Sequence, residues 1–111
     1  MLLDIRTYRC KPGMIGKHLE LYETHGKPPQ FRCLGAPVFY GKVETPDPNE
    51  YVHIWAYEDA ADRAAKRAVL WGDEDWLAYT RKSAELGALD SQSNKLVVSV
   101  GFDPLAAART G

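Results

Sequence analysis

A short alternating segment, residues 51–57, carries the side chains best suited to chemistry. Its sequence, YVHIWAY, places Tyr51, His53, Trp55 and Tyr57 on one side of an extended chain, because successive strand side chains point to opposite faces. A histidine among aromatic side chains is shielded from water, with a pKa within reach of neutrality, and it can act as an acid or a base. His53 is therefore the leading candidate for a catalytic residue.

A second alternating segment, residues 2–10, supplies polar partners on one of its faces: Asp4, Arg6 and Tyr8. Arg6 can hold a carboxylate or enolate oxygen, and Asp4 can orient or neutralise Arg6. We predict that His53 and Arg6 are the catalytic residues. The predicted ligand-binding residues share this polar and aromatic face: Asp4, Arg6, Tyr8, Tyr51, His53, Trp55 and Tyr57.

The same residues also have a structural interpretation. Asp4, Arg6 and His53 can form a satisfied polar network at a subunit interface, with the aromatic side chains as packing, since buried polar groups must be paired whether or not they catalyse a reaction. Ion-pair networks also resemble functional sites. We therefore favour a structural or simple ligand-binding role over catalysis.

The remaining histidines and cysteines do not indicate a metal site. His18 and His25 are seven residues apart on a predicted helix, hence about 10.5 Å along its axis. Zinc-binding nitrogens lie within about 2.1 Å of the metal, so this pair is a poor metal site. Cys10 and Cys33 are isolated and are expected to be reduced thiols. Since no Walker, GxSxG or dinucleotide-binding glycine pattern occurs either, we expect no metal and no cofactor.

A basic ridge follows residue 59 at three- and four-residue spacing: Arg63, Lys66 and Arg67. With acidic residues close by, this spacing is typical of a solvated helix face. Trp71 and Trp76 are expected to pack at a corner between two helices.

The strands and helices that position these residues can be predicted from the spacing of hydrophobic residues and from the turn residues between them. Strands are predicted at residues 2–10, 38–44, 51–57 and 96–102. Helices are predicted at residues 14–25, 60–71 and 74–86, the last two capped by Asp59 and Asp73. Pro28-Pro29 should prevent the first helix from continuing, which leaves residues 27–35 as a loop that is anchored by Phe31 and Leu34.

This order predicts an α+β, ferredoxin-like βαββαβ fold, with a four-stranded antiparallel sheet and helices on one face. One domain over residues 1–104 and a flexible C-terminal tail over 105–111 are expected. Strands 2–10 and 51–57 should be central neighbours.

The two faces of this sheet differ in side-chain type. The helices are expected to cover the aliphatic residues Leu3, Ile5, Val52, Ile54 and Ala56. The aromatic face would then expose roughly 600–1,000 Å² of ring surface, more than the roughly 300–600 Å² of the largest apolar patch on a typical monomer. We therefore predict a homodimer whose two sheets enclose a polar and aromatic cavity.

The 111 residues carry a net charge of −1, which favours neither nucleic acid nor an anionic membrane as a partner. Charged residues interrupt the apolar N-terminus, unlike a signal peptide, and no segment approaches the about 20 apolar residues of a membrane span. We expect a cytoplasmic protein.

Several motifs together resemble one known family. They are Ile5-Arg6-Thr7-Tyr8 with Lys11-Pro12-Gly13, Leu34-Gly35, His53-Ile54-Trp55-Ala56-Tyr57-Glu58-Asp59, Arg63 and Arg67, and Asp75-Trp76. From the first strand to about residue 79 the sequence resembles the NIPSNAP family, apart from Pro28-Pro29, where helical character is expected. The resemblance implies a ferredoxin-like fold that dimerises as an α+β barrel. It implies no single reaction, since the wider barrel superfamily includes cofactor-independent monooxygenases, isomerases, haem-degrading enzymes and proteins with no known activity.

Three functions stay open at this point. The leading hypothesis is a protein that binds a small, partly aromatic or acidic organic molecule. The second is a cofactor-independent monooxygenase or isomerase that uses His53 as acid or base and Arg6 to stabilise the developing anion. The third is a non-catalytic dimeric interaction module. An open pocket at His53 would favour a ligand, whereas a barrel filled by side chains would favour the module.

Overall fold

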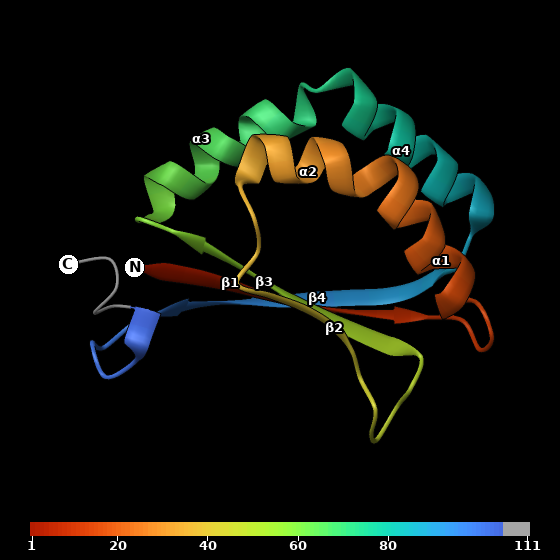
Figure 1. Cartoon of the computed structure of the whole chain (residues 1–111), viewed down its shortest axis with the longest axis horizontal. Helices are drawn as coiled ribbons and strands as arrows, with labels where there is room; N and C mark the ends of the chain where they lie inside the picture. Colours follow the sequence, from red (N-terminus) through yellow and green to blue (C-terminus); the bar gives the residue numbers. More distant parts are fainter. Residues whose placement is uncertain (106–111) are drawn as a thin grey trace.

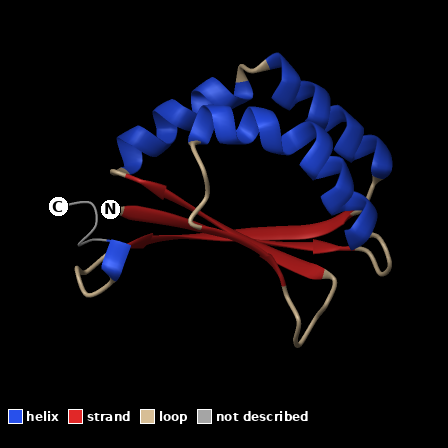
Figure 2. Cartoon of the chain, in the orientation of Figure 1, coloured by secondary structure: helices blue, strands red, loops and turns tan. Residues whose placement is uncertain are grey.

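The computed structural model describes residues 1–105. Its elements are, in chain order, β1 (Leu2–Cys10), α1 (Ile15–Leu21), the π-helix η1 (Tyr22–Gly26), α2 (Lys27–Leu34), β2 (Phe39–Lys42), β3 (Glu50–Tyr57), α3 (Ala60–Trp71), α4 (Glu74–Leu86) and β4 (Leu89–Val98). The strands form one antiparallel sheet in the order β2-β3-β1-β4, and the helices form a layer over one of its faces (Figures 1 and 2). The predicted ferredoxin-like α+β fold is confirmed. Most of the predicted tail, residues 106–111, lies outside the described residues.

The central pair of strands aligns the predicted chemical residues. In the antiparallel register of β1 and β3, Arg6 lies opposite His53, Asp4 opposite Trp55, and Tyr8 opposite Tyr51. Side chains opposite each other on one face of such a pair lie within contact distance. The register therefore brings the polar residues of β1 beside the aromatic residues of β3.

The two long helices begin as predicted. The backbone amide of Asp62 donates to the Asp59 carboxylate at 2.8 Å, and the Asp62 carboxylate accepts from the Glu58 amide at 2.9 Å, as in a capping box. Asp73 caps α4 by accepting from the Trp76 amide at 3.0 Å. These caps fix the start of both helices over the sheet.

The prediction of a loop after residue 26 is wrong, because the chain continues as α2. Pro28 and Pro29 occupy the first turn of α2, where a missing N–H costs nothing since the first helical amides have no partner within the helix. The preceding turn adapts as the π-helix, with the Lys27 amide donating to the Tyr22 carbonyl. The result is a nearly continuous α1–η1–α2 helix that passes over the sheet (Figure 1).

The last strand was also predicted wrongly, at residues 96–102. It begins seven residues earlier, at Leu89, and ends at Val98. Its first seven residues, LDSQSNK, lack hydrophobic alternation because β4 is an edge strand with nearly every residue exposed. Backbone pairing with β1, from Leu2–Val98 to Cys10–Leu89, holds it in place.

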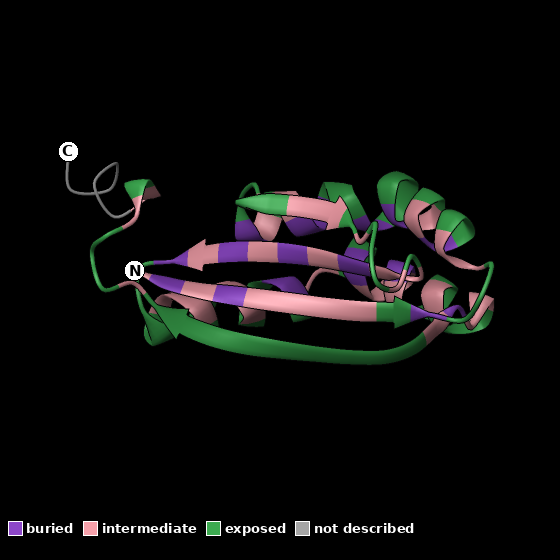
Figure 3. Ribbon diagram, turned by 90° about the horizontal axis from the view of Figure 1, so that it is seen from below, coloured by how far each residue is buried: buried purple, intermediate pink, exposed green. Residues whose placement is uncertain are grey.

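The helices cover the face of the sheet opposite to the predicted one. Tyr51, His53, Trp55 and Tyr57 are buried beneath the helices, whereas the aliphatic side chains that alternate with them stay partly exposed on the open face (Figure 3). The helix layer brings its own large side chains, and a single mainly aromatic core results. Its members are Tyr22, Leu34, Trp55, Tyr57, Leu70, Trp76 and Tyr79. Because the helices of the same chain cover the aromatic face, its size is no argument for a partner subunit.

Candidate functional site

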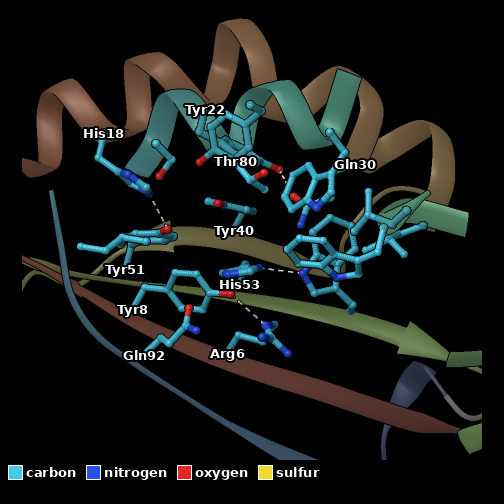
Figure 4. Close-up of a pocket in the computed structure, with 18 of the residues that line it drawn as sticks. Arg6, Tyr8, His18, Tyr22, Gln30, Tyr40, Tyr51, His53, Thr80 and Gln92 are labelled. Carbon is cyan, nitrogen blue, oxygen red and sulfur yellow. Dashed lines mark hydrogen bonds between the residues drawn. The ribbon is translucent and has the colours of Figure 1, made fainter. Parts of the chain in front are cut away.

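A cavity of about 450 Å³ lies between the helix layer and the sheet. Figure 4 shows Arg6, Tyr8, Tyr51 and His53 rising from the sheet toward the helices, with Tyr40 beside them. The lining residues come from β1, β2, β3 and β4 and from all the helices. The cavity thus lies inside a single chain, whereas the sequence predicted a cavity between two sheets of a dimer.

Five of the seven predicted ligand-binding residues line this cavity: Arg6, Tyr8, Tyr51, His53 and Trp55. Asp4 and Tyr57 do not line it, although both are buried beside it. Lining residues that were not predicted as site residues include His18, Tyr22, Gln30, Tyr40, Arg67 and Tyr79. Of these residues, Tyr40 could have been predicted from the sequence, since it lies opposite His53 in the hairpin formed by β2 and β3.

The imidazole of His53 is held in one tautomer by its neighbour on β3. The indole Nε1–H of Trp55 donates to His53 Nδ1 at 2.7 Å. An indole nitrogen is only a donor, so Nδ1 must be the acceptor, and the proton of the neutral ring lies on Nε2. Nε2 is buried and has no hydrogen-bond partner among the described residues. His53 therefore offers the cavity an unpaired N–H donor.

This geometry favours a different role for His53 from the predicted base. Burial, together with the charge of Arg6, lowers the pKa of His53 to about 3, and the charge of Asp4 opposes the shift only in part. The ring is neutral at pH 7, and its lone pair already accepts from Trp55. To act as a base, His53 would have to break that bond. As a donor to a ligand oxygen it needs no rearrangement.

Asp4 acts as an anchor for the charged end of the site. Its carboxylate, 0% exposed, accepts from Arg6 Nη1 at 3.1 Å, Arg63 Nε at 3.0 Å and Asn94 Nδ2 at 3.0 Å. Burial raises the pKa of Asp4, but the hydrogen bond from Asn94 and the charges of Arg6 and Arg63 outweigh it, so the pKa lies below its usual value. Arg6 also donates from Nε to the Tyr8 hydroxyl at 3.2 Å. With Nε and Nη1 both engaged, Nη2 is the nitrogen of Arg6 that is left to bind a ligand. This ion pair places Asp4 where it can orient or neutralise Arg6, as expected from the sequence.

The basic ridge of α3 is only partly a solvated helix face. Lys66 pairs with Asp62 at 3.2 Å, as the i,i+4 spacing predicts. Arg63 instead reaches down to Asp4, and Arg67 lines the cavity. The interpretation of these two arginines as solvated was therefore wrong. Sequence spacing could not show it, because the partner of Arg63 lies 59 residues away.

Tyrosine and histidine rings form the rest of the polar wall. His18 Nε2 and the Tyr51 hydroxyl are 2.6 Å apart, and burial lowers the pKa of His18. Tyr40 stacks on His53, with ring centroids 4.7 Å apart. The Tyr22 hydroxyl donates to the Gln30 side chain. Burial raises the pKa of Tyr22, Tyr40 and Tyr51, so these phenols are neutral donors at pH 7.

The unfolding free energy should fall as the pH is lowered from 7 to 5. The folded-state pKa of His53 lies below the ordinary value near 6.5, so the unfolded chain binds a proton that the folded chain refuses. His53 can contribute a slope of up to about 1.4 kcal/mol per pH unit in this window. Urea denaturation at each pH measures the slope. His53→Gln should reduce it, whereas His25→Gln, at an exposed position, should leave it unchanged; equal slopes in both variants would contradict the assignment.

Residues 1–105 contain no cluster of three or more His, Cys, Asp or Glu placed to hold a metal ion. Cys10 and Cys33 are free thiols, as predicted. None of the helices in this part of the chain is long and apolar enough to cross a membrane.

Comparison with known proteins gives a consistent family assignment. A NIPSNAP family protein with unknown function from Agrobacterium tumefaciens is 39% identical, with a TM-score of 0.85 over 95% of this chain and 93% of that one. An uncharacterized NIPSNAP domain protein from Burkholderia xenovorans is 29% identical, with a TM-score of 0.86 over 94% of this chain and 99% of that one.

More distant comparisons show the fold alone. An antibiotic biosynthesis monooxygenase is 21% identical, with a TM-score of 0.62 over 90% of this chain and 99% of that one. None of the curated proteins matches. The family model for NIPSNAP matches residues 3–104, nearly the whole described chain, and it confirms the resemblance seen in the sequence motifs. The chain belongs to the NIPSNAP family.

Proposed function

We propose that this protein binds a small organic molecule in the cavity between its sheet and its helices. The observation that carries the proposal is the cavity itself. Its volume of about 450 Å³ falls in the range of roughly 300–1,000 Å³ that is usual for ligand pockets, and its wall combines many aromatic side chains with a few convergent polar groups. A module with a filled interior would not leave such a space beside His53.

Unpaired buried atoms support the same proposal. Among residues 1–105, four buried side-chain nitrogen or oxygen atoms lack a hydrogen-bond partner. Three of them, His18 Nδ1, His53 Nε2 and Trp76 Nε1, belong to residues that line the cavity. An unpaired buried polar atom costs about 1–3 kcal/mol, so a ligand or water that pairs with these atoms gains that energy.

Native mass spectrometry of the purified protein tests the proposal. We expect the folded protein to retain a small molecule at a fixed stoichiometry, and the released mass identifies its chemical class. His53→Phe removes the central donor and should reduce the retained fraction, whereas His25→Gln should not. A cavity that binds nothing from extracts of the source cells would contradict the proposal.

We also propose that the protein is a homodimer that associates through the open face of the sheet. The half of this face near the start of β1 is apolar, with Leu3, Ile5 and Ile54 beside the more exposed Phe39 and Val97. Phe39 is 57% exposed, and Ile54 and Ile5 continue its row across the sheet. A face-to-face pair of such sheets would cover these side chains.

Ile5→Lys should convert the dimer to a monomer at micromolar concentration, because it places a charge at the centre of the proposed interface. Sedimentation velocity measures the change. Val69→Lys is the matched control: Val69 is 62% exposed on α3, in the helix layer, and its replacement should leave the dimer intact. A wild-type protein that sediments as a monomer would rule out this interface.

A cofactor-independent monooxygenase or isomerase is the second candidate. It is favoured by one observation, that Arg6 and the Nε2–H of His53 both border the same cavity, where they can stabilise a developing oxyanion. If the retained molecule is converted under air by the wild type and not by His53→Gln, this candidate replaces simple binding.

A further inference from the structure

The charges that line the cavity all have one sign. Arg6 and Arg67 are the charged residues of the wall at pH 7, and no Asp or Glu lines it. Arg67 has no ion pair or hydrogen bond to another residue within the described range. An unmatched guanidinium group beside a largely apolar cavity attracts an anion, because Coulomb interactions strengthen where water is excluded.

Three guanidinium groups gather at the same end. Burial raises the pKa of the Tyr57 hydroxyl, and the positive charges of three nearby arginines, Arg6, Arg63 and Arg67, lower it in part. Among residues 1–105, the Asp4 carboxylate pairs with Arg6 and Arg63 but forms no ion pair with Arg67. Asp4 therefore neutralises part of the charge of Arg6 and Arg63, whereas the charge of Arg67, which lines the cavity, is not neutralised by an ion pair with Asp4.

Two of the unpaired buried nitrogen atoms that line the cavity carry a hydrogen in the neutral side chain, so both are hydrogen-bond donors. His53 presents Nε2–H because Trp55 occupies Nδ1, and Trp76 presents its indole N–H. Both residues line the cavity and are more than nine-tenths buried. A ligand that satisfies them must bring hydrogen-bond acceptors.

We infer that the ligand is a planar aromatic anion, a carboxylate or an enolate, whose charged oxygens face Arg6 and Arg67 and whose ring lies between the aromatic walls. The inference rests on the proposed function and names the class of molecule that the cavity takes. Nη2 of Arg6 and the guanidinium of Arg67 supply charge-assisted donors, and His53 Nε2–H supplies a neutral donor.

The aromatic wall alone would also suit a cation. Aromatic cages bind quaternary ammonium groups through the negative faces of their rings. Here the two lining arginines and the absence of a lining carboxylate oppose a cation. The sign of the charge therefore separates the two classes, and it can be tested with molecules of nearly the same shape.

Cinnamate, cinnamamide and cinnamyltrimethylammonium are suitable probes, because they share a planar body and differ in charge. We expect cinnamate to bind roughly 10- to 100-fold more tightly than the amide by isothermal titration calorimetry, the effect of about one hydrogen bond to a charged group. The indole N–H signals in ¹H–¹⁵N spectra report the location, since Trp55, Trp71 and Trp76, the only tryptophans of the chain, all line the cavity.

Arg67→Met should remove most of this preference, because it deletes an unpaired lining charge without breaking an ion pair. Arg81→Met, at an exposed position of α4, is the matched control and should keep it. If cinnamate binds no more tightly than cinnamamide, or if Arg67→Met keeps the preference, the inference is overturned. In that case, binding of the amide or the ammonium probe would still support the proposed ligand-binding function. A cavity that binds none of the probes and retains no molecule in native mass spectrometry would overturn both the anionic ligand and the proposed function.

Discussion

Asp4→Ala should lower the free energy of unfolding by about 3–5 kcal/mol, the usual cost of removing one partner of a buried ion pair. The carboxylate is fully buried and accepts from Arg6, Arg63 and Asn94. Its removal leaves two partly buried guanidinium groups without a counter-charge. Urea denaturation at pH 7 and fixed protein concentration measures the change.

Asp75→Asn is the matched control for this variant. Asp75 also pairs with an arginine, Arg32, but at 3.5 Å and with 76% of its side chain exposed. Solvent-exposed pairs contribute about 0–1 kcal/mol, so the control should change stability by less than about 1 kcal/mol. A similar small loss in Asp4→Ala would show that Arg6 and Arg63 do not depend on Asp4.

The pH dependence of Asp4→Asn gives a second readout. Because the folded-state pKa of Asp4 is lowered, its carboxylate stabilises the fold above the unfolded-state pKa of about 3.9, and this stabilisation is lost as the pH falls through the folded-state value. The stability difference between wild type and Asp4→Asn should therefore be complete at pH 7 and shrink below about pH 4. A difference that stays constant down to pH 2 would exclude an electrostatic origin.

Local signals in the sequence were sufficient for most of the fold. The caps Asp59 and Asp73 marked the starts of α3 and α4, and period-2 alternation marked β1 and β3. Each depends on residues within a few positions of one another. Two elements failed because a local rule has an exception: proline is tolerated in a first helical turn, and an edge strand needs no apolar alternation.

The choice of covered face could not be made from strand patterns. Both faces of β3 are apolar enough to be buried, one with Trp55 and Tyr57, the other with Val52 and Ile54. What decides between them is the side chains that the helices contribute from elsewhere in the chain. Because of this error, the cavity was expected at a dimer interface, whereas it lies inside a single chain.

The residues of the candidate site also fall into two groups, those that the sequence could predict and those that it could not. Arg6, Tyr8 and His53 could be predicted, because antiparallel pairing of two adjacent strands places them on one face. His18 and Arg67 could not, since each reaches the cavity from a helix whose rotation is set by packing. The donor role of His53 could not be predicted either, because it depends on the 2.7 Å hydrogen bond from Trp55.

Trp55→Ala should cost about 3–5 kcal/mol of unfolding free energy, as for other large aromatic side chains removed from a core. Trp55 is 2% exposed and packs edge-on against Phe31 and His53. Trp55→Phe keeps much of this packing but removes the indole donor, which leaves His53 Nδ1 buried and unpaired. We expect a smaller loss for Trp55→Phe, of about 1–3 kcal/mol.

The imidazole ¹⁵N signals distinguish the hydrogen bond from packing. In the wild type, His53 should show a protonated Nε2 and an unprotonated Nδ1 at every pH from 5 to 8, because its pKa is about 3. In Trp55→Phe the tautomers should mix, since nothing then reserves Nδ1 as an acceptor. Trp71→Phe replaces a half-exposed lining tryptophan that makes no such bond and should leave the His53 signals unchanged.

The tautomer of His53 in the wild type decides whether this side chain can serve as a donor or as a base. A fixed Nε2–H tautomer means that His53 donates to a ligand oxygen over the whole physiological pH range, so binding of an anion should not require protonation of the ring. A wild-type ring that titrates near neutrality, or that carries its proton on Nδ1, would instead restore His53 as a base. In that case the electron pair on Nε2 would face the cavity, and catalysis would become the better explanation for the arrangement of Arg6 and His53 around it.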